Sequence, residues 1–343
     1  MQRGKSYLKS ALLGGGVVGA AIAAATAFFF LDSGRPLANL GEEYRYNLAE
    51  YAAIDPSLLL YEPLGQPIPT GLSQSRTIAV APDGVIWLTG DNAIVAMDAR
   101  GAMLRTIECD AAPLCLAFGK DGLLYAGLTD HVVAFSAEGK LIAQWDKPAD
   151  NALLTSLAAA DDCLFAADAA NKVVLRYTLD GVVSLKMGYK DADRNWPGFV
   201  IPSPYSFNLA LAPDGLLRIV NPGRHWVEAW TIDGHREWRW GETSIRVEGF
   251  SGCCNPAAIA ILPNGHIITS EKGLIRIKEY DEQGHFLGVV AGPEQLGWVE
   301  PLRVHDKPEQ LQVRGFGVAV DADGRVYVLD TVRNVIRIFE KKK

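Results

Sequence analysis

Short apolar runs alternate with tight polar turns along most of the chain. Six times an apolar run leads into an Asp-Gly, Asn-Gly or degenerate turn, and a second apolar run leaves it. A third β-rich run follows each pair and is often closed by another turn, such as Asp180-Gly181. The six turns are Asp83-Gly84, Asp121-Gly122, Asp162-Cys163, Asp214-Gly215, Asn264-Gly265 and Asp323-Gly324. Repeats of this length built only from hairpins are typical of propeller blades, so the pattern predicts an all-β, six-bladed β-propeller.

The two ends of the repeat region predict how the ring closes. The last repeat stops at Phe339-Glu340, after only three strands. The segment 58–65, LLLYEPLG, has the character of an outer blade strand. If this segment is the missing fourth strand of the last blade, that blade has no open sheet edge. We therefore expect the propeller to span residues 58–340 and to be closed by a strand at 58–65.

An apolar segment near the N-terminus predicts a membrane anchor. Residues 11–31 carry no charged side chain, and as a helix they span about 31 Å, the thickness of the hydrocarbon core of a bilayer. Arg3, Lys5 and Lys9 precede this run and Asp32 follows it. The positive-inside rule then predicts a cytoplasmic basic tail at 1–10, a transmembrane signal anchor at 11–31 and export of the remainder.

A cleaved secretory signal is the alternative for the same segment, because Ala25-Thr26-Ala27 suits a small-residue cleavage site. With an uncleaved anchor, the chain is a single-pass protein of the bacterial cytoplasmic membrane with its propeller facing the periplasm. With a cleaved signal, it is periplasmic or secreted. In both cases we expect residues 32–57, bracketed by Pro36 and Pro56, to form a juxtamembrane connector.

Composition and charge exclude one class of partner. With 343 residues, of which 49% are hydrophobic, the chain is large enough to bury a sizeable core as one ring. Its formal net charge is -7, and the first 31 residues contribute only cations, so the propeller is more acidic than the chain as a whole. Proteins that bind nucleic acid neutralise phosphates with basic side chains. Nucleic acid is therefore not an expected partner.

The final repeat carries the clearest family signature. It reads GVAVDADG at 317–324, VYVLD at 326–330 and NVIRIF at 334–339. This repeat pattern resembles that of the NHL-repeat family of six-bladed propellers, and the resemblance covers roughly residues 58–340. Earlier repeats depart from it, since Asn221 or Glu271 stands where Asp330 stands. The string FSGCCNP at 250–256 resembles that of a bacterial subgroup of NHL-repeat proteins whose function is unassigned. The resemblance implies the fold and leaves activity open, because such propellers include lyases, hydrolases and interaction modules.

Extra residues precede the inner strands of the last three repeats, at 190–205, 242–256 and 296–315. In a four-stranded blade, these connections emerge on the same face as the turn between the second and third strands. All three insertions are therefore expected to lie on one face of the ring. Long loops on a rigid scaffold are a common location of function.

The adjacent cysteines Cys253 and Cys254 are the most distinctive residues of that face. In an exported protein they have three interpretations: small residues in a tight turn, a vicinal disulfide or redox-active pair, or ligands of a thiophilic metal completed from elsewhere. Two thiolates alone do not complete a four-coordinate site, and neither a CxxC motif nor a spaced His pair accompanies them. The sequence requires no cofactor and leaves the metal and the oxidation state open.

Other candidate residues concern disulfide formation and binding. Cys109 and Cys115 flank a short loop, and export permits a disulfide between them. The alternative is that Cys115 occupies an inner-strand position that faces neighbouring blades. Trp, Tyr and Arg are the usual anchors of binding surfaces, although tryptophans in long loops also serve to pack those loops onto the blades. The binding-face candidates are Arg194, Trp196, Arg224, His225, Glu271, Lys272, Trp298, Arg303 and His305.

These observations lead to one functional hypothesis and one alternative. The first is a membrane-anchored periplasmic propeller that binds a partner protein or ligand, as an accessory subunit or assembly factor of a membrane or redox complex. The alternative is an enzyme, either a thiol- or metal-dependent redox protein centred on Cys253 and Cys254, or a propeller hydrolase or lyase. The sequence assigns no residue a catalytic role.

Overall fold

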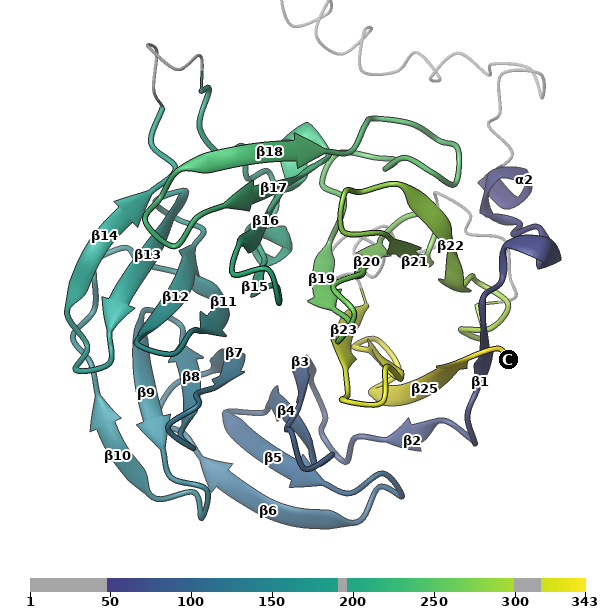
Figure 1. Cartoon of the computed structure of the whole chain (residues 1–343). Coiled ribbons are helices and arrows are strands. Elements are labelled where there is room, and N and C mark those ends of the chain that lie inside the picture. Colours follow the sequence, from purple (N-terminus) through teal and green to yellow (C-terminus); the bar gives the residue numbers. More distant parts are fainter. Residues whose placement is uncertain (1–47, 191–195, 299–315) are drawn as a thin grey trace, which may run out of the picture. The chain divides into compact units, whose positions relative to one another are not determined.

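The computed structural model describes residues 48–190, 196–298 and 316–343. Six antiparallel sheets form a ring in which the first strand of each blade is innermost (Figure 1). This arrangement confirms the predicted all-β, six-bladed propeller. Across the described ranges, no helix is long and apolar enough to cross a membrane. The predicted tail at 1–10 and anchor at 11–31 lie outside the described residues.

Each of the first five blades contains four strands that follow one another in the chain. The strands of blades 1 to 3 are β3 (Ser75–Val80), β4 (Ile86–Gly90), β5 (Ala93–Met97), β6 (Met103–Glu108), β7 (Pro113–Phe118), β8 (Leu124–Leu128), β9 (His131–Phe135), β10 (Leu141–Gln144), β11 (Leu154–Ala159), β12 (Cys163–Asp168), β13 (Val173–Thr178) and β14 (Val183–Met187). Those of blades 4 and 5 are β15 (Leu209–Leu211), β16 (Leu217–Asn221), β17 (Trp226–Trp230), β18 (Arg236–Trp240), β19 (Ala258–Ile261), β20 (Ile267–Glu271), β21 (Arg276–Tyr280) and β22 (Phe286–Ala291). Two short 3-10 helices, η3 (Pro204–Ser206) and η4 (Pro222–Arg224), lie in loops of blade 4.

The sixth blade combines strands from two distant parts of the chain. Its strands are β23 (Gly317–Val320), β24 (Val326–Asp330), β25 (Val335–Lys341), β1 (Tyr61–Pro63) and β2 (Ile68–Pro69). β1 pairs antiparallel with β25, and Tyr61 lies opposite Lys341. β2 also pairs with β25. The sheet of this blade therefore joins the beginning and the end of the propeller region.

A short helix, α2 (Leu48–Ala52), and a 3-10 turn, η2 (Pro56–Leu58), precede β1. They are the described part of the connector expected at 32–57. The Arg276 side chain donates a hydrogen bond to the carbonyl oxygen of Tyr51 at 2.6 Å. Residues from Leu48 onward thus belong to the same compact unit as the propeller.

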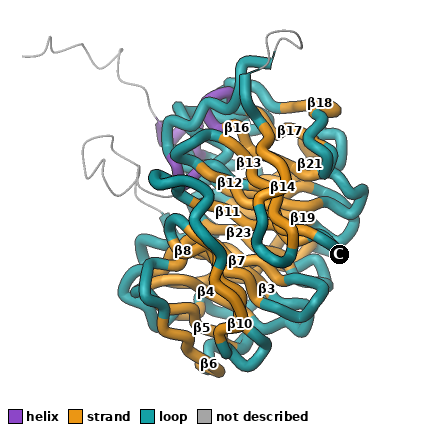
Figure 2. The backbone as a smooth tube through the Cα atoms, turned by 90° about the vertical axis from the view of Figure 1, so that its left-hand side faces the viewer, coloured by secondary structure: helices purple, strands orange, loops and turns teal. Residues whose placement is uncertain are grey.

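The turns form where the sequence places a short acidic or amide residue before glycine. In the first of them, Gly84 adopts a positive φ of 84°, which only glycine accepts without strain. The Asp83 side chain accepts a hydrogen bond from the Val85 N–H at 3.1 Å, and this contact stabilises the turn. Figure 2, a side view, shows loops and turns at the two ends of the strands. We call the face with the second-to-third-strand turns and the blade connections the loop face, and the opposite one the turn face.

The core lies between blades rather than in one centre. Six clusters of buried apolar side chains each join two neighbouring blades. A recurring contact sets their spacing, because a glycine in the third-to-fourth-strand turn receives an outer-strand side chain of the preceding blade. A Cβ atom placed on Gly181 would lie only 2.5 Å from the indole ring of Trp145. The glycine therefore leaves the space that the side chain of the neighbouring blade occupies.

Candidate functional site

The adjacent cysteines lie on the loop face, in the loop between β18 and β19. Both are free thiols, Cys253 exposed and Cys254 buried. Their sulfur atoms are 2.9 Å apart. Gly252 precedes them with a positive φ of 75°, so the chain turns sharply just before the pair. The structure therefore presents one accessible thiol backed by a second.

Asn255 fixes this loop to blade 5. Its side-chain nitrogen donates to the carbonyl oxygens of Ser251 at 2.7 Å and Lys272 at 2.9 Å. Its side-chain oxygen accepts from the Lys272 N–H at 2.9 Å. Asn255 is almost fully buried, so these bonds are shielded from water. One amide side chain thus connects the loop of the dithiol to the turn between β20 and β21.

Two predicted residues hold the start of the same loop. A carboxylate oxygen of Glu271 accepts from the Ser251 N–H at 2.6 Å and from its hydroxyl at 2.7 Å. His225 Nε2 lies 2.8 Å from the Gly252 carbonyl oxygen, and Nδ1 lies 2.8 Å from the Thr243 hydroxyl. A carbonyl only accepts, so in a neutral ring Nε2 carries the proton and Nδ1 accepts from Thr243.

The position of Glu271 has a recurrent structural role. It ends the second strand of its blade, where Asp168, Asn221 and Asp330 end theirs. Asp168 accepts from the Leu153 N–H at 3.1 Å, and Asn221 accepts from the Val200 N–H at 2.9 Å. These acceptors anchor backbone that leads into an inner strand. A carboxylate or amide side chain at this position therefore indicates that the residue anchors a loop, before any role in binding is considered.

Three alternate residues of β21 hold the segment that leads to the cysteines. Arg276, Lys278 and Tyr280 together donate to five consecutive carbonyl oxygens, those of Ile245 (3.0 Å), Arg246 (3.1 Å), Val247 (3.2 Å), Glu248 (3.0 Å) and Gly249 (2.5 Å). Lys278 Nζ also lies 3.3 Å from Glu271 Oε2. Burial lowers the pKa of Lys278 to about 8, while the charge of Glu271 acts in the opposite direction. Buried backbone carbonyls need such donors, so these side chains fix the path of the loop.

The thiols share an electrostatic environment with Lys272. Burial raises the pKa of the Cys254 thiol, and its hydrogen bond with Cys253 acts in the same direction. The Lys272 ammonium group opposes this shift because it stabilises the thiolate. That group also bonds to the hydroxyls of Ser203 at 3.2 Å and Ser206 at 3.3 Å. Lys272 is thus positioned to support a negative charge on Cys254.

A metal centre would need more ligands than the two thiols. Among the residues that the structure describes, no group of three or more His, Cys, Asp or Glu side chains is placed to hold a metal ion. The charged group that acts on Cys254 is instead the Lys272 ammonium, which also bonds to two serine hydroxyls. An ammonium at this position suits thiolate stabilisation.

The remaining binding-face candidates do not gather at the dithiol. Arg224 is exposed, with its guanidinium 5.7 Å from the ring of Trp226. Trp298 donates to Asp330 at 3.2 Å and stacks with Arg333, so it packs its loop onto blade 6. Trp196 is buried against aromatic side chains, including Trp230 at a centroid distance of 5.4 Å. Arg194, Arg303 and His305 lie outside the described residues.

Cys109 and Cys115 form no disulfide in the structure. Cys109 is half-buried, and its sulfur lies 3.7 Å from the Ile107 carbonyl oxygen. Cys115 is buried on β7, and its sulfur lies 3.6 Å from the Leu154 carbonyl oxygen of blade 3. The two thiols face different partners, which explains why the short sequence separation does not bring them together.

The sequence analysis missed several residues that build the site. Asn255 stands inside the conspicuous string FSGCCNP and directly follows Cys254, so its position next to the cysteines was the available signal. Ser203 and Ser206 are 69 and 66 residues from Lys272 and carry no local signal. Lys278 alternates with Arg276 on β21, a charged pattern in a strand that is buried throughout. Only the stacking of neighbouring blades gives these residues their roles.

No family model matches the chain, and no curated protein sequence matches it. Several solved structures are similar to it in fold. A catalytically inactive virginiamycin B lyase from Staphylococcus aureus with quinupristin is 14% identical, with a TM-score of 0.54 over 80% of this chain and 83% of the other. A streptogramin B lyase is 13% identical, with a TM-score of 0.53 over 81% and 97%. A protein of unknown function from Bacteroides thetaiotaomicron VPI-5482 is 13% identical, with a TM-score of 0.57 over 82% and 73%. At these identities the similarity establishes the propeller fold alone.

Proposed function

We propose that this chain is a membrane-anchored propeller of the NHL type that faces the periplasm and binds a partner protein or ligand at the Cys253–Cys254 dithiol. In this role it serves as an accessory subunit or assembly factor of a membrane or redox complex. The observation that carries the proposal is the exposed Cys253 thiol backed by Cys254 and Lys272. Asn255, Glu271 and His225 hold this loop in one conformation, and a preformed surface lowers the ordering cost of binding.

Photo-crosslinking from Cys253 tests the binding role. Intact cells are labelled with a thiol-reactive benzophenone and irradiated, and the adducts are compared with those from a Cys253→Ser/Cys254→Ser/Asp180→Cys variant. Asp180 is exposed on the turn face of blade 3, so it reports chance encounters. We expect an adduct of defined mass from Cys253 alone. Equal adducts from both positions, or none from Cys253, would refute a binding role for this face.

A thiol redox activity is the second candidate, favoured by the 2.9 Å separation of the two sulfur atoms. Two thiols and a partner disulfide would exchange to give one vicinal disulfide and two partner thiols, so that electrons and protons balance. Equilibration of the full-length protein with reduced and oxidised glutathione tests this activity. Loss of two hydrogen atoms from the peptide that contains both cysteines supports it. Retention of two thiols at every glutathione ratio contradicts it.

The membrane anchor rests on the uncharged segment 11–31 and the basic residues before it. Carbonate washing of membranes and the intact mass of the purified protein test this part separately. We expect the full-length chain to stay with the membranes. A mature protein that begins near Phe28 would instead establish a cleaved signal and a soluble periplasmic propeller.

A further inference from the structure

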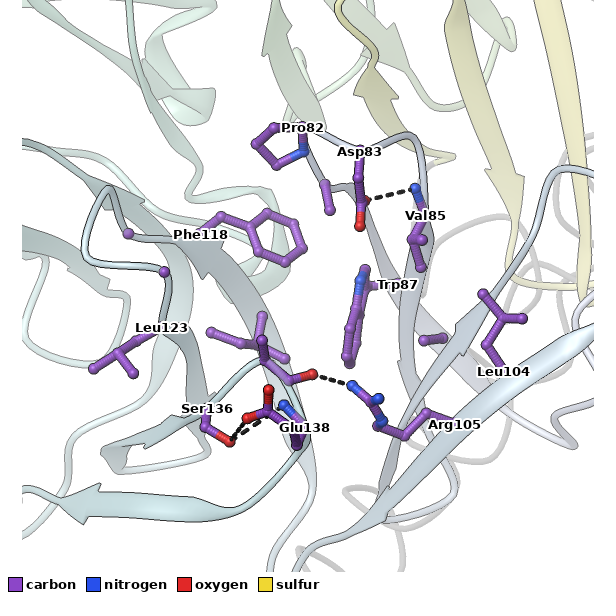
Figure 3. Close-up of a pocket in the computed structure, with 16 residues that line it drawn as sticks. Pro82, Asp83, Val85, Trp87, Leu104, Arg105, Phe118, Leu123, Ser136 and Glu138 are labelled. Atoms are coloured by element: carbon purple, nitrogen blue, oxygen red, sulfur yellow. Dashed lines mark hydrogen bonds between the residues drawn. The ribbon is translucent and has the colours of Figure 1, made fainter.

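A pocket on the turn face, between blades 1 and 2, has no part in the dithiol site. Its volume is about 550 Å³, within the range of cavities that hold small organic molecules. Three hairpins line it, namely β3–β4 of blade 1 and both β7–β8 and β9–β10 of blade 2, together with β6. Figure 3 shows these side chains converging from the two blades.

The pocket has an aromatic corner. The rings of Trp87 and Phe118 are 6.2 Å apart at an angle of 67°, an edge-to-face arrangement. Trp87 is only 7% exposed, so the surrounding core holds its ring in place. Leu104 also lines the pocket and is 55% exposed. Such walls accept a flat apolar ring, and the face of an indole also attracts cations.

The charged groups of the pocket are not balanced. Asp83 and Glu138 each contribute a carboxylate from a different blade, and Arg105 contributes the guanidinium. Arg105 donates a hydrogen bond to the Ala137 carbonyl oxygen. The hydrogen bond from Ser136 holds the pKa of Glu138 below its ordinary value, and the charge of Arg105 acts in the same direction. Glu138 is therefore expected to be ionised at neutral pH.

Asp83 is an exposed carboxylate without a cationic partner among the described side chains. One of its oxygens accepts the Val85 N–H at 3.1 Å. Within the described residues no cation forms an ion pair with Asp83, whereas Glu138 has Arg105 nearby. In Figure 3, Trp87 lies between Asp83 and Glu138. A ligand that presents one positive charge to Asp83 and a ring to Trp87 would satisfy both features.

We infer that this pocket binds a small organic cation with an aromatic ring, of the arylalkylamine class. The ring packs against Trp87 and Phe118, and the ammonium group faces Asp83. The inference does not depend on the dithiol or on the membrane anchor, because it rests on blades 1 and 2 alone. It gives the propeller a small-molecule site on the face opposite the proposed partner site.

Calorimetric titration of the full-length protein with two matched probes tests the site. Tryptamine and indole-3-propionate carry the same ring and opposite charges. We expect saturable binding of tryptamine at one site per chain, and at least about tenfold weaker binding of indole-3-propionate. No saturable binding of tryptamine, or equal binding of the two probes, would overturn the assignment.

Substitutions locate the binding in this pocket. Asp83→Asn is expected to weaken tryptamine binding about five- to tenfold. This variant is expected to fold, because Asn264 makes the same turn contact, accepting the His266 N–H at 3.1 Å. Leu104→Trp is expected to fill the pocket and abolish binding. Leu141→Trp is the matched control, since Leu141 is 52% exposed on β10 but does not line the pocket. Full binding by Leu104→Trp, or equal loss in Leu141→Trp, would contradict the site.

Discussion

Trp240 lies so close to Gly284 that no other residue fits at the glycine. A Cβ atom on Gly284 would be 2.2 Å from Cγ of Trp240, and Gly284 has a positive φ of 89°. The same indole lies 4.4 Å from the ring of Tyr280 and 5.9 Å from that of Phe250. Phe250 begins the string that carries the cysteines. The contact between blades 4 and 5 thus extends from the turn face to the base of the dithiol loop.

Gly284→Ala is expected to destabilise the propeller by about 2–4 kcal/mol, since it adds overpacking to backbone strain. Gly273→Ala is the matched control, because Gly273 has the same φ of 89° but no atom within 4 Å of an added Cβ. That variant is expected to lose only about 1 kcal/mol. Urea unfolding followed by circular dichroism measures both, and equal losses would refute the packing argument.

Asn255→Ala is expected to cost about 2–4 kcal/mol of unfolding free energy. The substitution leaves the N–H and carbonyl of Lys272 and the carbonyl of Ser251 without their partner in a buried setting. Asn151→Ala, at an exposed position, is expected to change stability by less than about 0.5 kcal/mol. Chemical denaturation compares the two. A neutral Asn255→Ala variant would show that the loop does not depend on this amide.

Lys272→Gln is expected to raise the pKa of Cys254, because the ammonium group stabilises its thiolate. The measurement is the pH dependence of iodoacetamide alkylation at Cys254, in a Cys253→Ala background that leaves one thiol at the site. The midpoint should shift to higher pH with Lys272→Gln and stay unchanged with Lys186→Gln, an exposed lysine on β14. Cys253→Ala alone should lower the midpoint relative to the wild type, since the Cys253 hydrogen bond raises the pKa. An unchanged midpoint in Lys272→Gln would remove Lys272 from the site.

Glu228 is expected to make stability fall as pH rises. It is fully buried on β17, and burial raises its pKa to about 7, against hydrogen bonds from Asn221 and Trp230 that act in the opposite direction. Between about pH 4.5 and 7 the folded state retains a proton that the unfolded chain has released, so this residue contributes a loss on the order of 3 kcal/mol across that window.

Glu228→Gln removes this titration. The difference in unfolding free energy between the wild type and this variant should therefore change between pH 4.5 and pH 8, in favour of the variant at the higher pH. Glu237→Gln, at an exposed position, is the control for the loss of a surface carboxylate. Urea titrations at several pH values measure both. A constant difference for Glu228→Gln would place the pKa of Glu228 near its ordinary value.

Truncation is expected to show how much residues 48–66, which contain α2 and β1, contribute to the closed ring. Removal of residues 1–47 leaves α2 and its contact with Arg276 intact, so the melting temperature should hardly change. Removal through Gln66 also deletes β1, which buries Tyr61 and pairs with β25. That loss is expected to cost several kcal/mol. Differential scanning calorimetry compares the two, and equal melting temperatures would show that β1 contributes little to closure.

The sequence by itself determined the blades, because their signals are local. An Asp-Gly pair sets a turn through a positive φ and a side-chain hydrogen bond, as at Asp83 and Gly84. Alternation of apolar residues sets which side of a strand is buried. The string FSGCCNP likewise marked the adjacent cysteines without any knowledge of the fold.

Only the tertiary structure decided what surrounds those cysteines. Asn255 and Lys272 are 17 residues apart, and Ser203 and Lys272 are 69 apart, so no local pattern joins them. Trp196 and Trp298 were equivalent as loop tryptophans in the sequence, but one is buried against Trp230 and the other bonds to Asp330. The pocket beside Trp87 likewise exists only where two blades meet. Contacts of this kind depend on how neighbouring blades pack against each other, which is a property of the assembled ring and of no single repeat.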